Sequence, residues 1–164
     1  MCIRDSKYIY TNIGYNLKVT DMQAAVGCAQ LQKLPAFIGK RRENFAFYMG
    51  QLKDYEGQFV LPQALPGAEP SPFGFPLTVR EEAGFAKNEI VEYLESKMIE
   101  TRMLFAGNLA RQPAYKGRKF EKIGALSGSD AIMNDTFWIG VYPGLTGEMR
   151  SYVAECFHAF MKNF

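Results

Sequence analysis

The sequence predicts an α+β domain with a small antiparallel sheet packed by helices. Amphipathic helical segments and short apolar runs follow one another without the regular strand–helix alternation that a parallel sheet requires. The length of 164 residues suits one domain, and 48% hydrophobic with 14% aromatic residues is enough to build its core. We therefore expect a few short strands covered by helices.

Two helices are expected near the start, on either side of Pro35. Thr20 and Gln23 have the spacing of a capping box, which predicts a helix over about 20–31. Pro35 suits the first turn of a second helix that reaches Leu52, because proline lacks the amide hydrogen that a helix interior uses. The first helix carries small residues that predict close packing against another domain or subunit: Ala24, Ala25, Gly27, Cys28 and Ala29.

The remaining elements follow from apolar runs, prolines and capping residues. Strands are expected at 59–61, 73–79, 101–105 and 137–142. Four prolines make 62–72 a loop. Helices are expected at 88–98, at 129–135 with Ser129 or Asp130 as the cap, and after Thr146, which caps the last helix.

Charge and composition argue against several classes of protein. The net charge is only +2, from 19 basic and 17 acidic residues, so neither a nucleic-acid nor a membrane-surface partner is expected. No apolar run is long enough to span a bilayer. Three scattered cysteines predict neither a disulfide framework nor a metal site, and we expect Cys28 to be a small buried side chain in a protein of the reducing cytoplasm. Residues 1–6 lack a signal-peptide pattern and are expected to be a start artefact or an unstructured stub.

The residues alone predict no catalytic centre. No nucleophile, metal-binding or phosphate-loop motif occurs, and the single histidine, His158, lies on the last helix with no evident acid or nucleophile partner, which favours a structural role. Asn16, in a glycine-containing turn before a capped helix, could present its amide to an anion, although an ordinary turn is the simpler reading. A glycine loop after the third strand carries Arg102, Asn108 and Arg111, residue types that bind phosphate or carboxylate. The basic run that follows, 116–122, is either solvated surface or suited to a nucleotide diphosphate.

Three segments resemble a known family. The segment IGYNLKVTDMQAAVGCAQLQKL resembles the DegT/StrS group of sugar aminotransferases and dehydratases, which are fold-type-I enzymes that use pyridoxal phosphate. The segments RMLFAGNLARQPAY and FWIGVYPGLT resemble one branch of it, the 3-dehydratases that act on CDP-4-keto-6-deoxyglucose in lipopolysaccharide sugar biosynthesis. The resemblance covers about residues 7–164.

The resemblance implies a reaction and a set of partners. The parent enzyme would remove the C3 hydroxyl of a nucleotide-linked 4-keto sugar, with pyridoxamine phosphate as the electron sink. Asn16 would reach across a homodimer to the cofactor phosphate of the other subunit. Arg102, Asn108 and Arg111 are our candidates, from chemistry and position, for contacts to the sugar or its diphosphate.

The matching region is the C-terminal part of such an enzyme, and this limits what the chain can do. It lacks the aspartate that pairs with the pyridine nitrogen and the Schiff-base lysine, which is a histidine in the dehydratase branch. It also lacks the cysteines that hold the branch's iron–sulfur cluster, through which a reductase partner delivers electrons. We therefore expect no catalytic residue in this chain and no activity from it alone. Two alternatives remain: part of an aminotransferase of the same family, and a non-catalytic α+β interaction domain.

Overall fold

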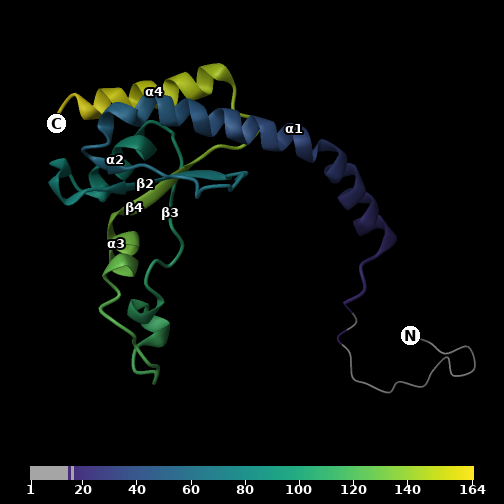
Figure 1. Cartoon of the computed structure of the whole chain (residues 1–164), viewed down its shortest axis with the longest axis horizontal. Helices are drawn as coiled ribbons and strands as arrows, with labels where there is room; N and C mark the ends of the chain where they lie inside the picture. The colour runs from purple at the N-terminus through teal and green to yellow at the C-terminus, as the bar shows by residue number, and fades with distance from the viewer. Residues whose placement is uncertain (1–14, 16) are drawn as a thin grey trace, which may run out of the picture. The chain divides into compact units, whose positions relative to one another are not determined.

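The computed structural model describes residue 15 and residues 17–164 (Figure 1). The chain divides into two units, Met1–Pro35 and Ala36–Phe164. Within the described residues, no helix combines the length and the apolar character that crossing a membrane requires.

Helix α1 extends over Asp21–Leu52. Its start confirms the capping box, since the Thr20 amide donates to Gln23 Oε1 at 3.0 Å and the Gln23 amide donates to Thr20 Oγ1 at 3.4 Å. The expected break at Pro35 is wrong, because helical structure continues on both sides of that residue. A proline removes one amide donor from the helical ladder, and the bonds of the neighbouring turns remain.

The sheet has four strands, all antiparallel, as the sequence predicted. They are β1 (Phe59–Val60), β2 (Gly74–Val79), β3 (Thr101–Met103) and β4 (Thr136–Gly140), in the order β1-β2-β4-β3. The register pairs Pro76 with Trp138, and Trp138 with Arg102. Since side chains alternate between faces, these three residues lie on one face of the sheet, and Phe75, Leu77 and Ile139 lie on the other.

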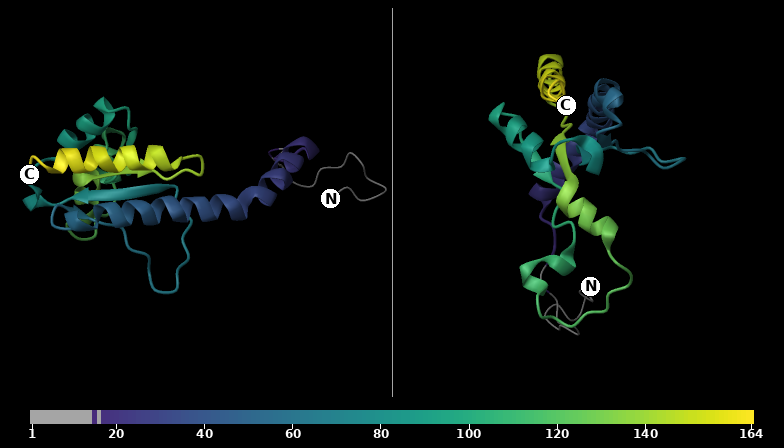
Figure 2. Two further views of the ribbon diagram at one scale, coloured as in Figure 1. Left: turned by 90° about the horizontal axis from the view of Figure 1, so that it is seen from above. Right: turned by 90° about the vertical axis from the view of Figure 1, so that its left-hand side faces the viewer.

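The core lies on the face that carries Phe75 and Leu77. The part of α1 after Pro35, α2 (Lys87–Ser96) and α4 (Gly147–Met161) supply many of its other side chains. Figures 1 and 2 show this part of α1 and α4 side by side above the sheet. The fully buried members from the helices are Tyr48, Leu52, Ile90, Leu94 and Phe157.

The ends of the helices meet the sequence expectations in part. Thr146 caps α4, because its Oγ1 accepts from the Met149 amide at 3.2 Å. Helix α3 (Ser127–Asp135) begins earlier than expected, after Leu126, and has no side-chain cap. Asp130 is therefore not a cap, and its carboxylate is used elsewhere.

A long connection joins β3 to α3. We call residues 104–126 the arm; it contains two short 3-10 helices, Leu109–Arg111 and Pro113–Tyr115. Figure 1 shows the arm and α3 together on the side of the sheet away from α4.

The structure also shows the surroundings of His158 and Cys28, for which the sequence made specific predictions. The ring of His158 has two polar neighbours, with Nδ1 2.7 Å from the Tyr55 hydroxyl and Nε2 3.2 Å from Gln51 Oε1, and its structural role stays a prediction. Cys28 is exposed rather than buried, since residues 21–36 of α1 are all exposed in this chain.

Candidate functional site

Asn108 and Arg111, two of the three residues expected to bind substrate, meet on one carboxylate. Arg111 donates to both oxygens of Asp130, through Nε to Oδ1 and through Nη2 to Oδ2 at 2.6 Å. Asn108 is buried and donates from Nδ2 to Asp130 Oδ1 at 2.7 Å. Its own Oδ1 accepts from the Ala110 amide at 3.1 Å and so caps the first 3-10 helix. We call Asn108, Arg111 and Asp130 the clamp.

The clamp is held by charge as well as by geometry. Hydrogen bonds from Arg111 and Asn108 lower the pKa of Asp130 to about 2, and the same ion pair raises the pKa of Arg111. The planar fork of Arg111 is therefore already filled by a carboxylate of this chain. The sequence predicts Ser129 or Asp130 as a helix cap and does not reveal this ion pair.

Arg102 lies apart from the clamp, on β3. It forms an ion pair with Glu100, and both side chains are largely exposed. It shares a cavity of about 580 Å³ with Trp138 and with Tyr48, whose pKa burial raises to about 12. Arg102 thus lines an open cavity, whereas Arg111 is paired with Asp130.

A second cavity, of about 560 Å³, lies along the arm. Its basic residues are Arg118, Lys119 and Lys122, and its one carboxylate is that of Glu121. Asn108 lines the same cavity, so the clamp and these cations belong to one neighbourhood. We call this cavity the arm groove.

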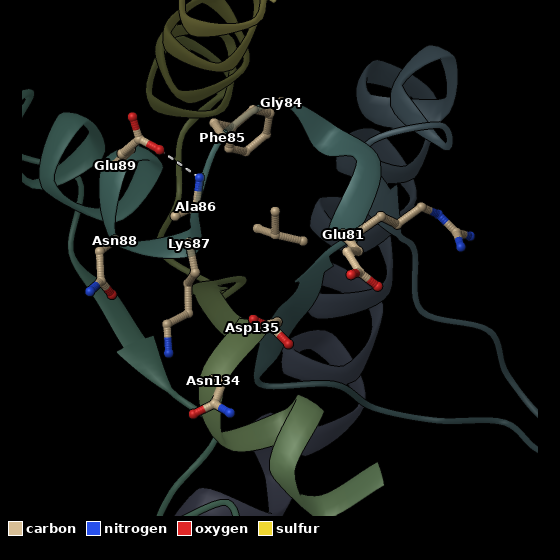
Figure 3. A pocket seen from close by; sticks show the side chains of 11 residues that line it. Glu81, Gly84, Phe85, Ala86, Lys87, Asn88, Glu89, Asn134 and Asp135 are labelled. Carbon is tan, nitrogen blue, oxygen red and sulfur yellow. Dashed lines mark hydrogen bonds between the residues drawn. The ribbon is translucent and has the colours of Figure 1, made fainter. Parts of the chain in front are cut away.

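A third cavity, also of about 560 Å³, lies at the start of α2 (Figure 3). Figure 3 shows Lys87 from α2 near Asn134 and Asp135 at the end of α3. Lys87 donates from Nζ to the Met133 carbonyl at 3.0 Å. The pKa of Lys87 is lowered by burial, and the charge of Asp135 offsets only part of this shift. Three carboxylates against two cations line this cavity, those of Glu81, Glu89 and Asp135 against those of Arg80 and Lys87. It is therefore poorly suited to an anionic ligand, and the arm groove is the better candidate.

No metal centre is found among the described residues. No cluster of three or more histidine, cysteine or acidic side chains within residues 15 and 17–164 could hold a metal ion. The two described cysteines, Cys28 and Cys156, are both free, one exposed and one buried. Asn16, the expected phosphate ligand, lies outside the described residues.

Comparison with known proteins decides the family. The model of the DegT/DnrJ/EryC1/StrS aminotransferase family matches residues 2–158. The chain belongs to this family. A solved relative, GDP-4-keto-6-deoxymannose-3-dehydratase with a trapped PLP-glutamate geminal diamine, aligns with a TM-score of 0.81 at 25% identity over 93% of this chain and 39% of that one. The fold is thus that of the C-terminal region of fold-type-I enzymes, as expected.

Curated relatives of the chain include a sugar 3-dehydratase and a lipopolysaccharide biosynthesis protein. It is 47% identical to the lipopolysaccharide biosynthesis protein RfbH of Salmonella typhimurium, over 95% of this chain and 36% of that protein. It is 43% identical to the dTDP-4-dehydro-2,6-dideoxy-D-glucose 3-dehydratase of Saccharopolyspora spinosa, over 96% of this chain and 34% of that enzyme. The chain therefore spans about a third of the length of these relatives.

Proposed function

We propose that the chain is the C-terminal part of a nucleotide-sugar 3-dehydratase, and that the parent enzyme acts on CDP-4-keto-6-deoxyglucose in lipopolysaccharide biosynthesis. The observation that carries this proposal is the 43% identity to a sugar 3-dehydratase over nearly the whole chain. The 47% identity to a lipopolysaccharide biosynthesis protein supports the same pathway.

Within that enzyme the chain would supply binding residues and no catalytic group. Arg102, whose guanidinium lines an open cavity, is proposed to bind the sugar or its diphosphate. Asn16 is proposed to bind the cofactor phosphate of the other subunit in a homodimer. Pyridoxal or pyridoxamine phosphate, when bound in the parent, supplies the electron sink for the loss of the C3 hydroxyl. Residues outside this chain are proposed to hold its ring.

The dehydratase assignment also implies an iron–sulfur cluster and a reductase partner for the parent. The ligands of that cluster would lie elsewhere in the parent. Cytoplasmic localisation belongs to the same proposal, since nucleotide sugars are made there by enzymes of this kind. The aminotransferase alternative rests on the family itself, whose model is named for aminotransferases.

Product analysis of the parent enzyme separates the two activities. The enzyme is incubated with CDP-4-keto-6-deoxyglucose and pyridoxamine phosphate, with either a reductase and NADH or glutamate as the co-substrate. A 3-deoxy sugar formed with the reductase, identified by mass and by its C3 proton resonances, is the expected product. A 4-amino sugar formed only with glutamate would refute the dehydratase proposal and support the aminotransferase.

A further inference from the structure

The arm groove concentrates positive charge. Arg118, Lys119 and Lys122 line it, and none of them takes part in an ion pair within the described part of the chain. Their side chains are exposed, so a ligand can reach them. Glu121 is the single opposing carboxylate, which leaves an excess of positive charge in a cavity of about 560 Å³.

Two half-exposed aromatic rings line the same cavity. Tyr115 is 44% exposed and Phe120 is 51% exposed. An exposed ring beside a cluster of cations provides a face on which a nucleobase can stack while its phosphates meet the charges. The combination therefore favours a nucleoside diphosphate over a simple inorganic anion.

The clamp and a close backbone contact hold the groove in place. Gly107 has a φ of +60°, and a Cβ at this position would lie 2.5 Å from the Met133 Cα, so only glycine allows the arm to approach α3 this closely. Gln112 donates from Nε2 to the Ala106 carbonyl at 2.8 Å and closes the turn. Together with the ion pair between Arg111 and Asp130, these contacts fix the arm at its junction with α3.

We propose that the arm groove binds the nucleoside diphosphate part of the sugar substrate. Arg118, Lys119 and Lys122 contact the diphosphate, and the rings of Tyr115 and Phe120 contact the base. Asp130 is a positioning residue, which acts through Asn108 and Arg111 and does not touch the ligand. This assignment rests on the proposed function for its choice of ligand and replaces the direct ligand role expected for Asn108 and Arg111.

The test is a calorimetric titration of the 164-residue chain with CDP and with inorganic pyrophosphate. We expect CDP to bind, and K119Q and K122Q each to weaken binding by about three- to tenfold, since each removes one charge-assisted contact at an exposed site. K33Q, an exposed lysine of α1, is the matched control and should leave the affinity unchanged. The proposed site would be wrong if CDP does not bind. It would also be wrong if K33Q weakens CDP binding as much as K119Q and K122Q do.

Two further measurements test the other parts of the proposal. Pyrophosphate should bind more weakly than CDP, and equal affinities would overturn the contact to the base. D130N should weaken CDP binding and speed amide exchange over 104–112 while exchange in β2 and β4 stays slow; unchanged exchange in the arm would overturn the positioning role. R118Q, on an exposed side chain, tests the groove if D130N fails to fold.

The outcome is distinguishable from a failure of the proposed function. If the parent enzyme makes a 3-deoxy sugar while the chain ignores CDP, only the groove is wrong. If the charge variants weaken CDP binding while the parent makes an amino sugar, only the dehydratase assignment is wrong.

Discussion

Asp130 is the carboxylate on which Asn108 and Arg111 converge, and its ionisation should report the clamp. Its pKa of about 2 lies below the ordinary 3.8, so the contribution of the clamp to stability is present above about pH 4 and is lost as the pH falls through about 2. We expect the Asp130 carboxyl carbon resonance to titrate with a midpoint near 2. In R111Q the midpoint should rise toward the ordinary value, because the largest cause of the shift is removed.

R102Q is the matched control for that titration. Arg102 pairs with Glu100 and makes no hydrogen bond to Asp130, so this variant should leave the midpoint where it is. An Asp130 midpoint near 3.8 in the unmodified chain would mean that the clamp does not form in solution.

Asn44 is a buried polar residue that joins α1 to the segment after β4. Its Nδ2 donates to the carbonyls of Val141 at 3.3 Å and Tyr142 at 2.8 Å, and its Oδ1 accepts from Arg150 Nη1 at 3.0 Å. We expect Asn44→Ala to lower the free energy of unfolding by about 2 kcal/mol, because it removes three hydrogen bonds at a buried site. The Tyr142 carbonyl keeps the Leu145 amide and Arg150 keeps Glu43, so the Val141 carbonyl loses most. Urea denaturation measures the loss. Asn88→Ala, at an exposed position of α2, should change the value by less than about 0.5 kcal/mol.

The ring of Trp138 packs so closely on Gly74 that a side chain at position 74 has no room. A Cβ at Gly74 would lie 2.3 Å from Cε3 of Trp138, whereas a Cβ at Gly140, the residue paired with Gly74, would meet nothing within 4 Å. We expect Gly74→Ala to cost about 2 kcal/mol through overpacking and to shift the fluorescence of Trp138, the chain's single tryptophan. Gly140→Ala should leave the fluorescence unchanged; an equal shift in both variants would show that the ring does not cover Gly74.

Secondary-structure elements were predictable wherever periodicity and capping agreed. Thr20 and Thr146 cap helices as expected because a cap depends only on residues within one turn. The continuation of α1 through Pro35 was not predictable. A proline shows where a helix can break, but whether it does break depends on the hydrogen bonds of the neighbouring turns.

The candidate site was predictable only in its residue types. The sequence placed Asn108 and Arg111 in a loop after a strand, and the structure confirms that position. It could not show that Asp130, 19 residues beyond Arg111, returns to fill the guanidinium fork, since such a contact depends on how the arm folds back. For the same reason the sequence predicts the arm groove only as a run of basic residues, which could be either solvated surface or a site for a nucleotide diphosphate.

At the scale of the whole molecule, we expect the chain alone to be inactive. The resemblance to the family places the ring-binding, base and cluster residues outside this chain. Absorbance titration with pyridoxamine phosphate should show no tight binding, and incubation with a nucleotide-linked 4-keto sugar should leave the sugar unchanged. Stoichiometric cofactor binding by the 164-residue chain would contradict this expectation. The parent enzyme, under the same conditions, is the positive control.

The first half of α1 makes self-association the expected behaviour of the isolated chain. Met22 is 80% exposed, Val26 63% and Leu31 67%, next to a surface of small residues that lets another backbone approach closely. Several exposed apolar side chains on one short helical segment favour association with a second chain. We expect the sedimentation coefficient to rise with concentration in analytical ultracentrifugation.

Variants locate the surface that associates. Val26→Gln should reduce the concentration dependence, because it removes apolar area from the centre of the exposed segment. Leu65→Gln changes a side chain that is 78% exposed in the loop between β1 and β2, and should leave the association as it is. A monomer whose sedimentation does not change with concentration would show that the small-residue surface of α1 needs no partner. It would also remove the physical support for a role of Asn16 across a homodimer, because that role requires the segment before α1 to approach a second subunit.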